Sequence, residues 1–139
     1  MRQIIPVSTI MSKNLIALNR TDDLERAELL FKRYGIRHIP VVTGDTIIGM
    51  LSYTDLLRIS FADAVDEDES EVDTLVYNMF TIDQVMVKNV TTVSSNTSIK
   101  EVAQILATKE FHALPVVDDG ILVGIVTTTD LINYLLKQL

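Results

Sequence analysis

Two stretches of the sequence share one pattern: GMLSYTD at residues 49–55 and GIVTTTD at residues 124–130. Each has a glycine, two apolar residues, a hydroxyl residue, two further residues and an aspartate. A shift of 75 residues places the first on the second, and the same shift places IPVV at 39–42 on LPVV at 114–117. Because the match needs no gap, it indicates duplication of a small supersecondary unit that does not bury its apolar face alone.

Each unit is predicted to have the element order β-α-β-β-α. Short β-prone stretches at 14–18 and 89–93 predict the first strands. The next helix of each unit is expected to begin at a capping residue with a glutamate three positions later. Asp22 and Glu25 form this pair in the first unit, and Ser98 and Glu101 form it in the second.

Two apolar strands follow in each unit, and a short turn separates them. The turns are GD at 44–45 and DDG at 118–120, which is a hairpin signal between apolar runs. The last helix is expected to begin near Thr54 in the first unit and near Thr129 in the second. The fold class is therefore α+β, built from two tandem β-α-β-β-α repeats.

The composition is typical of a cytoplasmic protein. The chain has 139 residues, is 47% hydrophobic and lacks cysteine, which fits a reducing, cytoplasmic location. No apolar run is long enough for a membrane span, and the N-terminus lacks the apolar core of a secretory signal. The net charge is −7, and the excess acid lies in the stretch 63–73. No basic face favours nucleic acid or an anionic membrane.

The acidic stretch is predicted to join two repeats of one compact module. The repeats are assigned to residues 5–60 and 79–138, with a linker at 61–78. The second half of the linker has the apolar spacing of an amphipathic helix that begins at Ser70 and packs against the module. The residues with this spacing are Val72, Leu75, Val76 and Met79.

No enzyme motif occurs in the sequence. It has neither the phosphate loop of P-loop enzymes nor a G-x-G-x-x-G or G-x-S-x-G element. The two histidines, His38 and His112, are far apart and lack the helical spacing of metal ligands. We therefore expect no catalytic residue and no metal site, and we predict that the protein is not an enzyme.

The hydroxyl-x-x-aspartate element suits a nucleotide. Ser52 and Thr127 end a strand, and an aspartate falls in the first turn of the following helix. The unpaired N–H groups and positive dipole of a helix N-terminus attract phosphate, and a nearby carboxylate accepts from a ribose diol. Plain helix capping produces the same residue pattern. Duplication would copy a cap as faithfully as a binding site, so both interpretations stay open.

Residues upstream of the two prolines favour a ligand. Arg37 and His112 occupy the same repeat position, three residues before Pro40 and Pro115, and His38 lies beside Arg37. A donor at equivalent positions of both units can reach an anionic ligand. The alternatives are a solvated arginine, a histidine at a strand edge, and prolines placed where a strand tolerates a missing N–H.

With these motifs, in this order and spacing, the chain resembles a tandem pair of CBS (cystathionine-beta-synthase) domains, the arrangement called a Bateman module. The resemblance covers nearly the whole chain. It implies a pseudo-two-fold pair whose sheets pack face to face and leave two clefts. Family members bind adenosine compounds in these clefts, namely AMP, ADP, ATP or S-adenosylmethionine, and they commonly form flat homodimers.

The resemblance assigns ligand-binding positions in both repeats. In the first repeat they are the ribose-binding Asp55, the hydroxyl residue Ser52, Thr54 near the phosphate, the segment Arg37, His38, Ile39 and Pro40, and Ile16 at the base pocket. In the second repeat they are Asp130, Thr127, Thr129, the segment His112, Ala113, Leu114 and Pro115, and Thr91. Ser52 replaces the commoner threonine and bulky Tyr53 follows it, while Ala113 removes a possible phosphate contact. The two sites are therefore expected to be unequal.

The function implied is that of a non-catalytic regulatory module. It would bind an adenosine-containing ligand between its repeats, require no cofactor, and signal through the geometry of a homodimer or of a protein partner. The alternative is a dimerisation or protein-interaction module that binds no ligand. The chain is expected to be either a stand-alone pair or a part of a larger protein.

Overall fold

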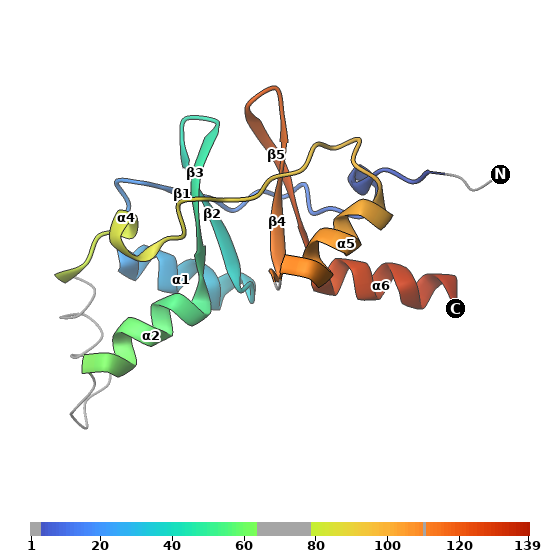
Figure 1. Ribbon diagram of the computed structural model, residues 1–139. Helices are drawn as coiled ribbons and strands as arrows, with labels where there is room; N and C mark the ends of the chain where they lie inside the picture. Colours follow the sequence, from blue (N-terminus) through green and yellow to red (C-terminus); the bar gives the residue numbers. More distant parts are fainter. Residues whose placement is uncertain (1–3, 64–78, 110) are drawn as a thin grey trace. The chain divides into compact units, whose positions relative to one another are not determined.

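The computed structural model describes residues 4–63, 79–109 and 111–139 (Figure 1). The first repeat has the elements η1 (Val7–Thr9), β1 (Leu18–Asn19), α1 (Leu24–Tyr34), β2 (His38–Thr43), β3 (Thr46–Ser52) and α2 (Tyr53–Asp63). The second has α4 (Ile82–Val85), α5 (Ile99–Lys109), β4 (Ala113–Asp118), β5 (Ile121–Thr127) and α6 (Thr128–Gln138). The α+β class and the tandem repeat predicted from the sequence are confirmed. The helix predicted around Val72, Leu75 and Val76 lies outside the described residues.

The two sheets have matching registers. In the first, β1 runs parallel to β2, and β2 runs antiparallel to β3. In the second, β4 and β5 form an antiparallel pair. A register shift falls between Val41 and Val42 in β2 and between Val116 and Val117 in β4, which are equivalent repeat positions. Figure 1 shows α1 and α2 beside the first sheet and α5 and α6 beside the second.

The first strand of each repeat is shorter than predicted. The stretch 14–18 pairs only at Leu18, the first residue of β1, and the stretch 89–93 forms a single parallel bridge from Val93 to Val116. Leu18 is fully buried and Val93 nearly so, whereas residues 14 and 15 are exposed. β-propensity alone does not form a strand where no neighbouring strand supplies hydrogen bonds and burial.

One of the two predicted helix starts is shifted by one residue. Asp23, not Asp22, is the N-cap of α1, and its carboxylate accepts from the Arg26 backbone N–H at 2.8 Å. Asp22 instead accepts from the backbone N–H of Asn19, so it closes the preceding turn. The predicted start of α5 is confirmed, because Ser98 Oγ accepts from the Glu101 N–H at 3.1 Å.

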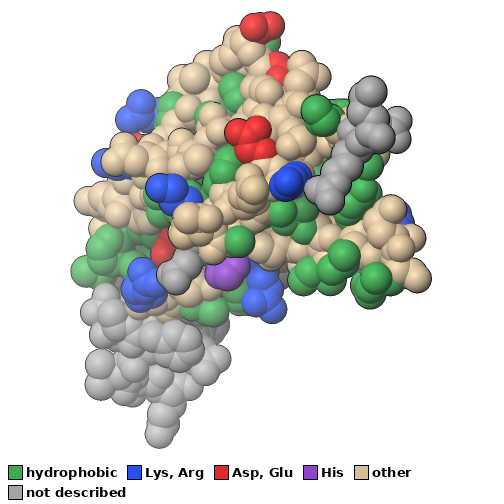
Figure 2. All heavy atoms as spheres, turned by 45° about the vertical axis from the view of Figure 1, so that its right-hand side comes forward, with side chains coloured by type: hydrophobic (Ala, Val, Ile, Leu, Met, Phe, Trp, Pro, Cys, Tyr) green, Lys and Arg blue, Asp and Glu red, His purple; other side chains and the backbone are tan. Residues whose placement is uncertain are grey.

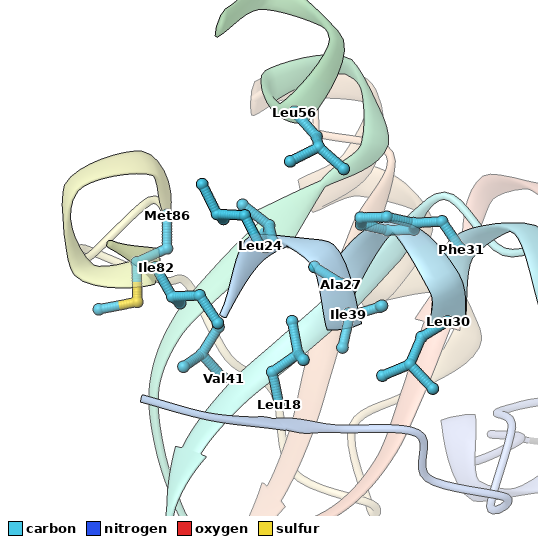
Figure 3. Close-up of a cluster of buried hydrophobic side chains, with 11 residues drawn as sticks. Leu18, Leu24, Ala27, Leu30, Phe31, Ile39, Val41, Leu56, Ile82 and Met86 are labelled. Atoms are coloured by element: carbon cyan, nitrogen blue, oxygen red, sulfur yellow. The ribbon is translucent and has the colours of Figure 1, made fainter. Parts of the chain in front are cut away.

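Each sheet packs on its helices through its own hydrophobic cluster. Side chains from α1, α2, the first sheet and the α4 segment meet in one cluster, which includes the fully buried Leu24, Ile39 and Leu56 (Figure 3). A second cluster joins α5 with β4 and β5 and includes Val102 and Leu114. Burying these apolar side chains is the main favourable contribution to folding.

The compact units of the chain combine parts of both repeats. One unit is Ile16–Asn89, and the other consists of Met1–Leu15 together with Val90–Leu139. Each unit therefore contains most of one repeat and the leading segment of the other. The leading segments are residues 5–15 of the first repeat and 79–89 of the second. The chain passes from one unit to the other twice, after Leu15 and after Asn89.

Backbone bridges hold the leading segments in place. Ser12 exchanges two hydrogen bonds with Ile125 of β5, at 2.8 and 3.1 Å between nitrogen and oxygen. Val87 makes the same pair of bonds with Met50 of β3, both at 2.9 Å. Each bridge adds a short antiparallel contact to the outer edge of a hairpin, at equivalent positions of the two repeats.

A glycine permits each of these contacts. A Cβ atom on Gly124 would lie 2.6 Å from Met11 Sδ and 3.0 Å from the Ser12 carbonyl oxygen. A Cβ atom on Gly49 would overlap Met86 Sδ and lie 3.0 Å from the Val87 carbonyl oxygen. The glycine that opens each seven-residue motif therefore makes room for a methionine from the leading segment.

Candidate ligand-binding site

The site predicted in each repeat lies where a hairpin runs directly into a helix. β3 ends at Ser52 and α2 begins at Tyr53, whose backbone N–H donates to the Arg37 carbonyl oxygen at 2.8 Å. In the second repeat, the Thr128 N–H donates to the His112 carbonyl oxygen at 3.0 Å. The residue three positions before each proline is thus fixed beside a helix N-terminus. The structure brings these two parts of the predicted site together in both repeats.

The hydroxyl residues of the motif are the helix caps. Ser52 Oγ accepts from the Asp55 backbone N–H at 3.0 Å, and Thr127 Oγ1 accepts from the Asp130 N–H at 3.2 Å. Each helix therefore begins one residue before the predicted Thr54 and Thr129, which are exposed in the first turn. The capping interpretation of the motif is correct for the hydroxyl residues. It does not exclude a ligand, because the first-turn N–H groups of Thr54 and Thr129 lack intrahelical partners, whereas those of Tyr53 and Thr128 are bonded to backbone carbonyls.

The two motif carboxylates have different partners. Asp130 Oδ2 accepts from the Thr127 backbone N–H at 2.9 Å, so that residue and its cap form a reciprocal capping box. Asp55 Oδ1 instead lies 3.3 Å from Arg58 Nη1. The carboxylate of Asp55 is therefore held by an exposed arginine, and that of Asp130 by its own helix start.

The remaining predicted residues differ in exposure. Ile39 and Leu114 are buried in the two hydrophobic clusters. Pro40 and Pro115, the next residues of the same strands, are also buried. Ile16 is half-buried and packs against the first cluster, whereas Thr91 is exposed. Arg37 and His112 are exposed, and His38 and Ala113 are half-buried.

Arg58 is a candidate site residue that the sequence motifs do not indicate. Its side chain is 74% exposed and is the ion-pair partner of a predicted ribose-binding carboxylate. The spacing of three residues after Asp55 on a predicted helix is a signal for such a pair. The equivalent position in the second repeat is Asn133, so comparison of the repeats would also have singled the arginine out.

Tyr53, which follows the first hydroxyl residue, is directed toward the core. Its ring centroid lies 5.3 Å from that of Phe31 on α1, with the ring planes inclined at 58°. This geometry is a favourable aromatic contact. The bulk of Tyr53 is therefore accommodated by packing between α1 and α2.

Metal-ligating and membrane-spanning features are not found in the described parts of the chain. Within residues 4–63, 79–109 and 111–139, no group of three histidine or acidic side chains is arranged to hold a metal ion. None of the helices in these ranges has the length and apolar character needed to cross a bilayer.

The sequence matches the CBS domain family model twice, at residues 7–62 and 82–137. These matches include both seven-residue motifs and both hairpins. The chain therefore belongs to the CBS domain family and contains a tandem pair of these domains.

Solved structures share the fold over almost the whole chain. The AcuB protein of Vibrio cholerae is 28% identical with a TM-score of 0.81, and the match covers 98% of this chain and 93% of AcuB. The CBS domain pair of protein MJ0100, solved in complex with 5′-methylthioadenosine and S-adenosyl-L-methionine, is 25% identical with a TM-score of 0.74. That match covers 94% of this chain and 98% of the other.

A sequence relative is considerably longer than this chain. Protein MJ1225 of Methanocaldococcus jannaschii is 23% identical over 129 residues, which are 92% of this chain. The chain spans only 46% of the length of that protein. The similarity therefore concerns the CBS pair and not the rest of the relative.

Proposed function

We propose that this chain is a non-catalytic regulatory module that binds an adenosine-containing ligand at the N-termini of α2 and α6. The observation that supports the proposal most is the repetition of one local geometry. In both repeats three groups meet at one helix N-terminus. They are a hydroxyl cap, a first-turn aspartate, and the backbone carbonyl of the residue before β2 or β4. A terminus of this kind attracts phosphate, and its aspartate is suited to a ribose diol.

The MJ0100 pair supports the choice of ligand class, because that CBS pair is similar over almost the whole chain and was solved with two adenosine compounds. In this proposal the adenosine-containing ligand is AMP, ADP, ATP or S-adenosylmethionine, and no cofactor is required. The ligand acts by binding two arrangements of the module with different affinities, because only differential affinity shifts such an equilibrium.

Thermal unfolding with and without ligand tests the proposal. A ligand at 100 times its dissociation constant stabilises the folded protein by about 2.7 kcal/mol. We expect a clear rise in melting temperature with at least one of the four compounds. The rise should disappear in a variant carrying both Asp55→Asn and Asp130→Asn. The control is Asp45→Asn in the β2–β3 turn, which removes one negative charge outside the site.

An interaction module without ligand is the second candidate function, and the surface of α6 favours it. Hydrophobic side chains reach the surface of the molecule in Figure 2. On α6, Ile132, Leu135 and Leu136 are 57%, 56% and 61% exposed, and their spacing places them on one helix face. We propose that this face contacts a second copy of the chain in a cytoplasmic homodimer.

The two functions give different results. If none of the four compounds changes the melting temperature, the ligand-binding proposal is wrong and the interaction module remains. The homodimer is tested by light scattering of the wild type and of Leu135→Glu. We expect the substitution to produce a monomer with an unchanged far-ultraviolet circular dichroism spectrum, since Leu135 is mostly exposed. A wild-type protein that is monomeric at all accessible concentrations contradicts the homodimer.

A further inference from the structure

The two candidate sites differ in positive charge. Beside the N-terminus of α2 lie Arg37, through its backbone contact with Tyr53, and Arg58, through its ion pair with Asp55. The equivalent residues in the second repeat are His112 and Asn133. Two arginines in the first repeat thus correspond to a histidine and an asparagine in the second, and the ion pair places the guanidinium of Arg58 beside the Asp55 carboxylate.

Arg58 is able to change partners at little cost. Its guanidinium lies 3.3 Å from the Asp55 carboxylate and its side chain is 74% exposed. An ion pair this accessible to water contributes little to stability, because solvent screens the attraction and the long side chain loses freedom. When the carboxylate binds a ribose, the arginine can turn to a phosphate on the same ligand. Its planar set of donors fits phosphate oxygens in a bidentate manner.

The second site has no such compensation for a negative ligand. The carboxylate of Asp130 is fixed by the capping bond to Thr127, and Asn133 occupies the position of the arginine. A phosphate near α6 would meet the helix dipole and the His112 region, with a carboxylate close by and no guanidinium at the equivalent helix position. An adenosine ligand of low negative charge avoids the repulsion from Asp130 and still provides a ribose diol.

From these differences, and resting on the proposed function, we infer that the two sites select ligands by charge. The first-repeat site at α2 takes a phosphorylated adenosine ligand. The second-repeat site at α6 takes an adenosine ligand without phosphate, such as a nucleoside or a thionucleoside. Arg58 determines this specificity in the first site, and Asn133 does so in the second.

Isolating each site by substitution allows the inference to be tested with AMP and adenosine as probes. Asp130→Asn leaves the first-repeat site, and its amide oxygen can still accept the capping bond. Asp55→Asn leaves the second-repeat site. Isothermal titration should show that the Asp130→Asn protein prefers AMP to adenosine by about tenfold, the size expected for one charge-assisted contact. The Asp55→Asn protein should bind adenosine at least as tightly as AMP.

Reciprocal exchange of the two positions supplies the matched variants. Arg58→Asn in the Asp130→Asn background should remove most of the AMP preference and its dependence on salt. Asn133→Arg in the Asp55→Asn background should create a preference for AMP. Both substitutions are on exposed helix positions, so circular dichroism should show an unchanged fold.

The outcomes separate this inference from the proposed function. If adenosine compounds bind but the two isolated sites have equal preferences, or if Arg58→Asn leaves the AMP preference intact, the inference is overturned and the proposed function stands. If neither probe nor any of the other adenosine compounds binds the wild type, the proposed function fails and the inference fails with it.

Discussion

Asp130 and Thr127 are joined by two reciprocal hydrogen bonds, from the Asp130 N–H to the Thr127 hydroxyl and from the Thr127 N–H to the Asp130 carboxylate. The residue that the family resemblance assigns to ribose binding is therefore also a structural cap. Asp55 makes the first of these bonds with Ser52 through its own N–H, but its carboxylate is paired with Arg58. The aspartate that ends each seven-residue motif thus has a different environment in each repeat.

Removing the carboxylate should affect stability unequally in the two repeats. Asp130→Ala is expected to reduce the free energy of unfolding by about 1 kcal/mol, because one half of a capping box is lost. Asp55→Ala should cost about 0.5 kcal/mol or less, since it removes an exposed ion pair and not a cap. Urea denaturation of both variants measures the difference. Equal losses would show that the Asp130 bond adds nothing to the cap.

Adding a methyl group at either motif glycine should be destabilising. Gly124→Ala places a Cβ against Met11 Sδ, and Gly49→Ala places one against Met86 Sδ. Overpacking of this kind costs about 1–3 kcal/mol, which denaturant unfolding can measure. Neither glycine has a positive φ, so the effect is steric.

A double-substitution cycle provides the control for this prediction. Met11→Ala removes the sulfur that opposes the new methyl group, so Gly124→Ala should cost less in that background. Some of the cost should persist because the Ser12 carbonyl oxygen would still lie 3.0 Å away. A Gly124→Ala protein as stable as the wild type would contradict the close approach of the leading segment.

Asp118 should stabilise the fold in a pH-dependent way. The hydroxyl and the backbone N–H of Ser95 hydrogen-bond to its carboxylate, and both bonds lower the pKa of Asp118 below its ordinary value of 3.8. Because the folded-state pKa is the lower one, this stabilisation is fully present well above pH 3.8 and is lost as the pH falls through the folded-state pKa. Ser95→Ala should raise the pKa of Asp118 toward 3.8.

Nuclear magnetic resonance titration of the Asp118 carboxyl group measures this pKa directly. The wild-type midpoint should lie below 3.8. The Ser95→Ala midpoint should lie between the wild-type midpoint and 3.8, because the backbone N–H of residue 95 still donates. The stability difference between the two proteins should shrink in acid. A wild-type midpoint at or above 3.8 would show that Ser95 does not stabilise the charged form.

The segment Ile16–Asn89 should fold better by itself than the repeat 5–60. The longer piece retains the fully buried Ile82 and the Val87 bridge to Met50, whereas the repeat lacks both. Loss of a buried isoleucine and its neighbours leaves one face of the cluster open to water. Circular dichroism melts of the two fragments should show a cooperative transition only for Ile16–Asn89. A cooperative transition in 5–60 would contradict this expectation.

Most of the secondary structure could be predicted from the sequence because the signals are local. The Ser98–Glu101 helix start, the hairpin turns and the strands that contain Pro40 and Pro115 all follow from a few adjacent residues. Asp119 and Gly120, for example, both have positive φ, as the second turn requires. Where two candidate caps adjoin, as at Asp22 and Asp23, the pattern does not distinguish them, and the prediction was one residue early.

The features that the sequence analysis missed depend on contacts between distant segments. Met11 and Met86 are identical at equivalent repeat positions, but an alignment of the repeats does not reveal which hairpin each one covers. The shortened first strands have the same cause, since their length is set by the partner strand. The partner of Asp55 was within reach of helix spacing rules, yet an exposed arginine gives no apolar signal.

The reciprocal exchange of leading segments has a consequence for the origin of the chain. A protein consisting of one repeat would have a leading segment and a hairpin edge that do not complete each other within the same polypeptide. Two such molecules could satisfy both by exchange, as in a domain-swapped dimer. Tandem fusion of the gene would make that exchange intramolecular and independent of protein concentration. Such a fusion would leave each half free to change by itself, and Arg58 and Asn133 are equivalent positions that differ.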